Sequence, residues 1–235
     1  SITLRVQLDM SRLSENKTMK LLITTFFTLL LGFAGNSYGQ DFEETKLLAE
    51  QGSAGAQHNL GLMYAKGDGV PENKAEAVKW YRLAAEQGNA GAQNNLGLMY
   101  YRGDGVPQNK AEAVKWYRLA AKQGSAGAQH NLGLMHAKGD GVPENKAEAV
   151  EWYRLAAEQG DAGAQNNLGL MYVKGDGVPQ NYVKAYVWWS LAAAQGNENG
   201  KNNRDIVSEQ LTPSQKTQGQ EIAAKCFESD HKDCD

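Results

Sequence analysis

The sequence predicts an all-α protein, a right-handed α/α solenoid (superhelix) of helix-turn-helix repeats with terminal capping helices. A 36-residue unit that occurs four times is the main observation behind this prediction. Each copy has two segments of helical apolar periodicity, separated by a turn rich in glycine and proline. One such pair cannot bury its apolar faces alone, so neighbouring copies are expected to stack. The copies are residues 51–86, 87–122, 123–158 and 159–194.

Residues 19–39 are predicted to be a signal peptide. Lys20 supplies a positive charge, and the apolar run that follows it is shorter than a membrane span needs. Small side chains at Ser37 and Gly39 are typical of a cleavage site, which places the mature N-terminus at Gln40.

Met19 directly precedes this segment, so residues 1–18 are expected to be upstream sequence that takes no part in the fold. The mature protein is then expected to be periplasmic or secreted, with no stable membrane insertion. A retained N-terminal anchor is the alternative interpretation.

Residues 40–50 look like the second helix of a repeat that lacks its first helix. Phe42 and Leu47 align with Val78 and Leu83 of the first full copy. We therefore expect a helix here that packs on the first repeat and caps the array.

The first helix of each copy is expected to begin after an N-cap residue and to end at a glycine. In the first copy, the Ser53 side chain can accept a hydrogen bond from an unpaired helix N–H group. Gly67 and Gly69 permit the left-handed backbone of a turn, and Pro71 is unsuited to a helix interior.

The second helix is expected to begin at Asn73, which has Glu76 three residues later, as in a capping box. In the fourth copy Lys184 replaces this glutamate, so the box is broken there. Four tryptophans at one helix position are predicted to pack inside the array, whereas Trp189 and Tyr101 are not assigned to the core by the pattern. The four are Trp80, Trp116, Trp152 and Trp188.

The repeat resembles that of the Sel-one-like repeat family, which is related to the tetratricopeptide repeats. The shared pattern is A-x-x-x-L-G-x-x-Y, then G-x-G-V, then K-A-x-x-W-Y-x-x-A-A-x-x-G, and it covers residues 51–194. The resemblance implies a solenoid that acts as an adaptor for other proteins, and in bacteria such proteins are often exported. His136 in place of tyrosine and the segment 182–189 depart from the pattern. The matching residues of the first copy are Ala56, Leu60, Gly61, Tyr64, Gly67, Gly69, Val70, Lys74, Ala75, Tyr81, Ala84 and Ala85.

Residues 195–235 are expected to form a degenerate repeat and a C-terminal cap. The segment 199–210 keeps the length of a first helix without its Leu-Gly signature, and Pro213 is placed to open another helix. Cys226 and Cys234 are predicted to form a disulfide, because paired cysteines in an oxidising compartment usually join. Two free thiols in a frayed tail are the alternative.

Composition and motifs favour binding over catalysis. The formal net charge of −3 provides no broad basic face for nucleic acid. The histidines are spaced too far apart to share a metal ion, so neither a metal nor another cofactor is expected. A cell-wall-related or β-lactam-acting enzyme is the alternative, because some cysteine-rich relatives are associated with β-lactams. However, the S-x-x-K motifs at Ser14 and Ser229 lie outside the repeats, without accompanying S-D-N or K-T-G motifs.

The resemblance places one face of the first helices along a concave groove that binds a partner protein or peptide. Apolar side chains alternate there with histidine or asparagine, a mixture suited to an extended or helical peptide. Packing of the leucines against the next repeat is the alternative. The predicted groove residues are His58, Leu62, Asn94, Leu98, Tyr101, His130, Leu134, Asn166, Leu170 and Val173, with Ala65 and Ala137 between them.

Overall fold

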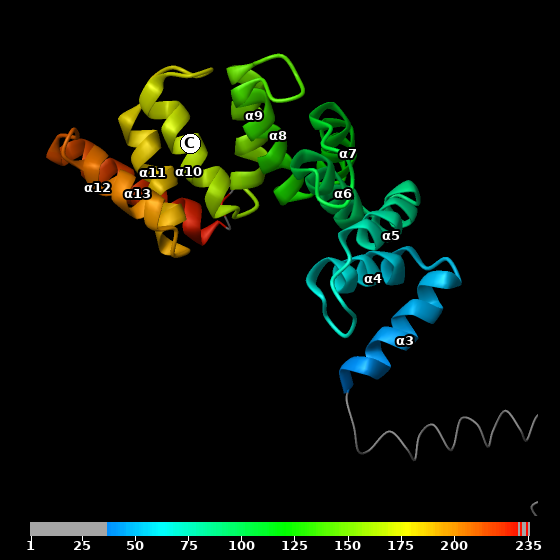
Figure 1. The fold of residues 1–235 in the computed structure, drawn as a ribbon. Coiled ribbons are helices and arrows are strands. Elements are labelled where there is room, and N and C mark those ends of the chain that lie inside the picture. The colour runs from blue at the N-terminus through cyan, green and yellow to red at the C-terminus, as the bar shows by residue number, and fades with distance from the viewer. Residues whose placement is uncertain (1–36, 230, 232–233, 235) are drawn as a thin grey trace, which may run out of the picture. The chain divides into compact units, whose positions relative to one another are not determined.

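The computed structural model describes residues 37–229, 231 and 234, and every regular element in this part of the chain is an α-helix (Figure 1). The chain divides into a unit of residues 1–41 and a unit of residues 42–235, and the second unit contains the repeats. Most of the predicted signal segment, and all of residues 1–18, lie outside the described residues. The helices are α3 (Ser37–Glu50), α4 (Ala54–Lys66), α5 (Lys74–Glu86), α6 (Ala90–Arg102), α7 (Lys110–Lys122), α8 (Ala126–Lys138), α9 (Lys146–Ala157), α10 (Ala162–Lys174), α11 (Tyr182–Ala194), α12 (Glu198–Ser208) and α13 (Pro213–Glu228).

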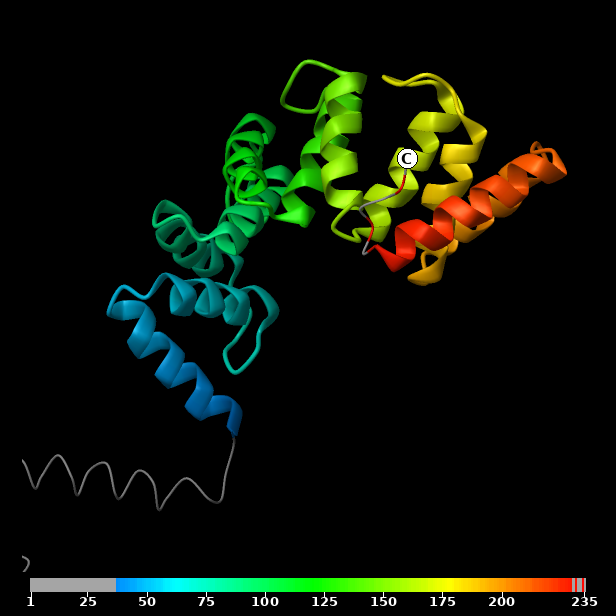
Figure 2. The ribbon, with the colours of Figure 1, turned by 180° about the vertical axis from the view of Figure 1, so that it is seen from behind.

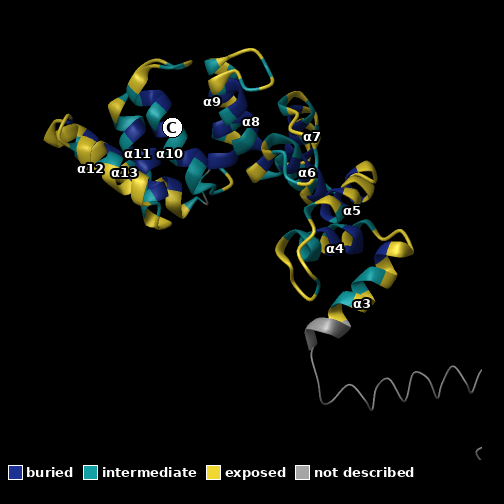
Figure 3. Ribbon diagram, viewed as in Figure 1, coloured by how far each residue is buried: buried dark blue, intermediate teal, exposed yellow. Residues whose placement is uncertain are grey.

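Helices of the four repeats pack as consecutive pairs. The first helix of each repeat packs on the second, as α4 does on α5 and α6 on α7, and each second helix also packs on the first helix of the next repeat. Buried residues line these contacts, whereas the turns between the paired helices are largely exposed (Figure 3). The structure therefore confirms the predicted all-α solenoid of stacked helix pairs.

Side chains cap the helices at the predicted residues. Ser53 accepts a backbone hydrogen bond at the start of α4, and Asn73 accepts one from Glu76 at the start of α5. Asn181 caps α11 in the same way, although Lys184 replaces the glutamate. Each first helix ends at a glycine with left-handed backbone, namely Gly67, Gly103, Gly139 and Gly175.

A glycine lets the two helices of each repeat approach closely. A Cβ atom on Gly61 would lie 2.6 Å from Cδ1 of Tyr81, a distance that real side chains do not show. In the fourth repeat Trp189 takes the place of the tyrosine and lies against Gly169, which explains why this tryptophan is only 3% exposed. The other two pairs are Gly97 with Tyr117 and Gly133 with Tyr153.

The predicted tryptophan stripe packs against the core. Trp188 is buried, and Trp80, Trp116 and Trp152 are half-buried against the apolar clusters of the helix pairs. The stripe is therefore packing material and not an open stacking platform.

In the second, third and fourth repeats, the turn lies against the start of the preceding repeat's second helix. Gly105 has a φ of 69°, and a Cβ atom there would overlap the backbone of Lys74 at the beginning of α5. The second glycine of the turn is thus required both by the left-handed backbone and by this approach. The same contact recurs between Gly141 and Lys110, and between Gly177 and Lys146.

A buried glutamine joins each repeat to both of its neighbours. The Gln57 side chain, 5% exposed, donates to the backbone oxygen of Ala49 over 3.1 Å and accepts from the side chain of Gln87 over 2.6 Å. Because its amide is paired, the burial cost of this polar group is offset. Gln93, Gln129 and Gln165 make the equivalent pairs.

Helices α12 and α13 close the C-terminal end of the described unit. Both pack on α11 and lie beside it in opposite views (Figures 1 and 2). Leu191 of α11 is 2% exposed in the cluster that contains Cys226, whereas the equivalent Leu83 is 44% exposed. Cys226 and Cys234 are joined by a disulfide in this structure. The cap therefore covers an apolar position that the other repeats leave open.

Candidate protein-binding face

Side-chain hydrogen bonds connect the first helices of successive repeats along one face. Asn95 lies 3.1 Å from Nε2 of His58, and one repeat later the Asn131 amide donates to Asn94 over 3.3 Å. The series continues with Asn167 and His130 at 3.0 Å, and with Asn203 and Asn166 at 3.0 Å. We call Asn95, Asn131, Asn167 and Asn203 the asparagine ladder.

Each rung of the ladder uses only part of its hydrogen-bonding capacity. A side-chain amide has two N–H donors and an oxygen acceptor, and the contact to the preceding repeat occupies one of these groups. Asn95 also makes a hydrogen bond to the Tyr81 hydroxyl, which leaves part of its amide free. The ladder residues are half-buried, so they border solvent. The ladder can therefore offer both donors and acceptors to a polypeptide backbone.

In the structure the predicted histidine and asparagine side chains are hydrogen-bonded to the next repeat. His58, Asn94, His130 and Asn166 each contact the ladder asparagine of the next repeat. The ladder asparagines themselves are not among the predicted residues, although Asn95, Asn131 and Asn167 directly follow the predicted Asn94, His130 and Asn166. This repetition was the signal that could have identified them.

The two histidines that contact the ladder, His58 and His130, have different neighbours. Nδ1 of His130 lies 3.1 Å from the Asp161 carboxylate, which also caps α10. Burial acts to raise the pKa of Asp161, but hydrogen bonds from His130 and from backbone N–H groups hold it below its usual value. Asn89 is the equivalent cap residue near His58, and burial lowers the pKa of that histidine.

Leucines of the same helices serve both the core and this face. Leu62, Leu98, Leu134 and Leu170 are half-buried and pack against the apolar clusters between repeats. Their remaining exposed surface lies one helical turn beyond the predicted histidine and asparagine positions. Packing and surface contact are therefore compatible at these positions. Ala65, Ala137 and Val173 are half-buried in the same clusters.

Tyr101 is held in place by the next repeat. Its hydroxyl donates to Asp140 over 3.3 Å, and Nζ of Lys110 lies 5.6 Å from its ring centroid. Lys110 also pairs with Asp140 at 2.8 Å. Tyr101 is half-buried as a result, and its ring forms one wall of a cavity of about 190 Å³.

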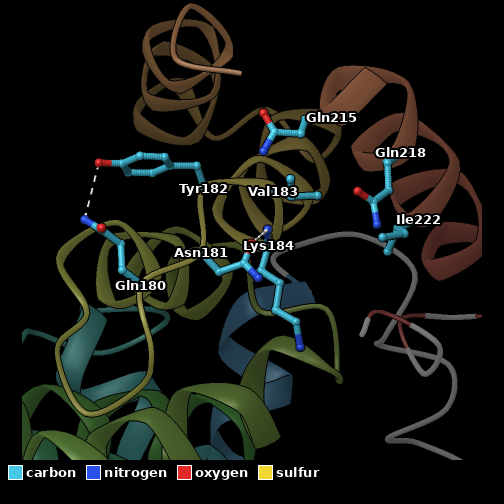
Figure 4. Close-up of a pocket in the computed structure, with 8 residues that line it drawn as sticks. All are labelled: Gln180, Asn181, Tyr182, Val183, Lys184, Gln215, Gln218 and Ile222. Atoms are coloured by element: carbon cyan, nitrogen blue, oxygen red, sulfur yellow. Dashed lines mark hydrogen bonds between the residues drawn. The ribbon is translucent and has the colours of Figure 1, made fainter. Parts of the chain in front are cut away.

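A second, larger cavity of about 520 Å³ lies between the start of α11 and α13 (Figure 4). Its walls are polar and include side chains that already serve the helix starts. Asn181 caps α11, Gln215 completes the capping box of α13, and Gln180 donates to the Tyr182 hydroxyl over 3.3 Å. This cavity follows from the way the C-terminal cap packs.

His136, the residue that departs from the repeat pattern in the third copy, is buried with 3% exposure. Its Nε2 lies 3.3 Å from the Glu148 carboxylate. Burial lowers the pKa of this histidine, against the attraction of Glu148. In the described residues no group of three or more histidine, cysteine or acidic side chains could hold a metal ion.

Comparison with known proteins identifies related sequences and structures. A protein-family model described as Sel1 repeat matches residues 54–89, 90–125, 126–161 and 162–197. No curated protein matches the sequence.

Two solved structures are similar along much of the chain. A protective antigen of uropathogenic Escherichia coli strains with an SLR fold is 36% identical, with a TM-score of 0.78, over 95% of this chain and 48% of that one. A Sel1 repeat protein from Oxalobacter formigenes is 43% identical, with a TM-score of 0.60, over 64% of this chain and 62% of that one. The chain therefore spans less than two thirds of either structure.

Proposed function

This chain belongs to the Sel1 repeat family, whose members generally mediate protein–protein interaction, and from this premise we propose that it is an exported adaptor that binds a partner protein or peptide along the asparagine ladder. The family is typically a non-catalytic scaffold, which supports a binding role without catalysis.

Continuity of the ladder is the observation that carries this proposal. Four consecutive rungs face the same way because each is fixed by a hydrogen bond to the preceding repeat. An extended polypeptide presents N–H and C=O groups at regular intervals, and the rungs offer matching acceptors and donors. Flanking leucines, half-exposed, can add apolar contact to a partner's side chains.

Export is supported by the order of charged, apolar and small residues in 19–39. In the described residues no helix has the length and apolar character to cross a bilayer. N-terminal sequencing of the mature protein tests export. A chain that begins at Gln40 is the expected result, and one that keeps residues upstream of Met19 in the cytoplasm contradicts it.

Affinity capture from the periplasmic fraction, followed by identification of the retained proteins, tests the binding function. The Asn95→Ala/Asn167→Ala variant should lose a partner that the native chain retains, because it removes two rungs. A matched control is Leu83→Ala/Leu119→Ala, which shortens exposed side chains on the second helices. If the control loses the partner while the ladder variant keeps it, binding lies on the second helices and the proposal is wrong.

A further inference from the structure

A small apolar cavity lies where α6, α7 and α8 meet, beside the ladder residue Asn131. Its volume of about 190 Å³ is below the range of ordinary small-molecule sites, so it suits one or two side chains. Its lining residues are Leu98, Tyr101 and Arg102 of α6, Tyr117 of α7, and Asn131, Leu134 and Met135 of α8.

Two of the lining residues distinguish the second repeat from the other three. Tyr101 and Arg102 occupy the end of α6, where the other copies have a small aliphatic residue followed by lysine. Both residues that are specific to the second repeat therefore line the cavity. The equivalent pairs are Ala65-Lys66, Ala137-Lys138 and Val173-Lys174.

The wall formed by Tyr101 is fixed before any partner arrives. Its hydroxyl bonds to Asp140, and Lys110 pairs with the same carboxylate. A wall held in this way loses little conformational freedom on binding. The charge of Asp140 is engaged with lysine, so Asp140 is not placed to neutralise Arg102.

Two side chains at this cavity have hydrogen-bond donors that no other group in the described residues uses, namely Arg102, which is exposed to solvent, and Tyr117. In the described part of the chain, neither the Arg102 guanidinium nor the Tyr117 hydroxyl makes a hydrogen bond or ion pair. The two lie close enough for the positive charge of Arg102 to act on the pKa of Tyr117, which burial raises. A guanidinium beside a hydroxyl is suited to a carboxylate, which accepts from both.

Resting on the proposed binding function, we propose that this cavity selects an acidic residue in an extended segment of the partner, with an aliphatic residue two positions away on either side. Side chains two positions apart share one face of an extended segment. The carboxylate lies against Arg102 and Tyr117. The flanking aliphatic side chains lie against Leu98 and Leu134, while the segment's backbone bonds to Asn131.

Fluorescence anisotropy with four labelled peptides in a Gly-Ser background tests the proposal. Their central segments are Leu-Gly-Glu-Gly-Leu, Leu-Gly-Gln-Gly-Leu, Leu-Gly-Lys-Gly-Leu and Ser-Gly-Glu-Gly-Ser. The native chain should bind the first about tenfold more tightly than the second, as expected for a charge-assisted hydrogen bond, and more tightly than the other two. Arg102→Gln should abolish the preference for Glu over Gln. Lys138→Gln, which removes a positive charge at the same position of the next repeat, should keep it.

The outcomes separate this inference from the wider function. If the second peptide binds as well as the first and Asn131→Ala weakens both equally, the ladder binds peptide but the cavity does not select acid. If Arg102→Gln keeps the preference, the charge is recognised elsewhere and the inference is wrong. If no peptide binds while capture of a partner still depends on Asn95 and Asn167, the cavity assignment fails and the adaptor function stands. If no peptide binds and capture of the partner does not depend on Asn95 and Asn167, both proposals are wrong.

Discussion

The side-chain amide of Gln123 donates a 2.8 Å hydrogen bond to Oε1 of Gln93, a residue that also donates to the backbone oxygen of Ala85. One buried side chain thus ties together the second helices of two successive repeats and the first helix between them. The glutamine–glutamine contact occurs four times in all, and it involves none of the ladder asparagines.

Replacement of a buried glutamine is expected to weaken the array more than replacement of its exposed partner. Gln129→Ala should lower the free energy of unfolding by about 1–3 kcal/mol, because it removes two hydrogen bonds, one to the Ala121 carbonyl and one from the Gln159 side chain. Gln159→Ala, which removes the exposed partner of Gln129, should cost less. Urea denaturation followed by circular dichroism measures both. If both variants lose the same free energy of unfolding, burial of the glutamine amide adds nothing to the stability of the array.

The glycine beneath each tyrosine is expected to tolerate no side chain. A Cβ atom on Gly133 would lie 2.5 Å from Cδ1 of Tyr153, whose ring is buried, so Gly133→Ala should be strongly destabilising. Gly127 in the same helix is the control, since its nearest neighbours would be 3.9 Å away. Gly127→Ala should stabilise the helix by about 0.5–1 kcal/mol. Thermal melting distinguishes the two variants, and a neutral Gly133→Ala would refute the packing argument.

Stability is expected to fall as pH drops below about 6.5, because two histidines titrate at lower pH in the folded chain than when unfolded. Burial lowers the pKa of both His58 and His136 from 6.5. The unfolded chain therefore takes up protons first, and their stabilising contribution is complete above 6.5 and lost below it. His136→Tyr, which restores the repeat residue, should reduce the difference in melting temperature between pH 7.5 and 5.5. An unchanged difference would exclude His136 as a source.

The C-terminal disulfide, which joins Cys226 of α13 to Cys234 after that helix, is expected to stabilise the cap that packs on α11. Thiol titration of the unreduced, denatured protein should detect no free cysteine, whereas two free thiols would rule the bond out. Closure of a loop between residues eight positions apart is worth about 2–3 kcal/mol in the chain-entropy view. Cys226→Ser/Cys234→Ser should therefore lower stability by up to that amount and expose Leu191. Hydrogen exchange of the α11 backbone amides, compared between the native chain and this variant at increasing urea concentration, reports whether Leu191 becomes exposed.

Periodicity was sufficient to predict the helices and their caps, because Ser53 and Asn73 act through bonds within a few residues. The site was harder to predict, since its defining bonds join residues 37 positions apart, as between His58 and Asn95. A helical wheel orients each helix alone and cannot show which side chains meet across repeats. Tyr101 of α6 illustrates this limit, because its partner Asp140 lies 39 positions away, in the turn between α8 and α9.

The contacts between repeats also bear on how such a chain can change in length. Gly105 packs against the backbone of Lys74, and Gly141 packs in the same way against that of Lys110. The joint between neighbouring repeats, meaning this contact of a turn glycine with the preceding repeat, therefore has the same form at each of these positions. Copies one and three differ only at Tyr64/His136 and Lys79/Glu151. Recombination between such copies would insert or delete whole units while every joint is rebuilt from the same residues. The number of rungs presented to a partner can therefore evolve separately from the stability of each joint.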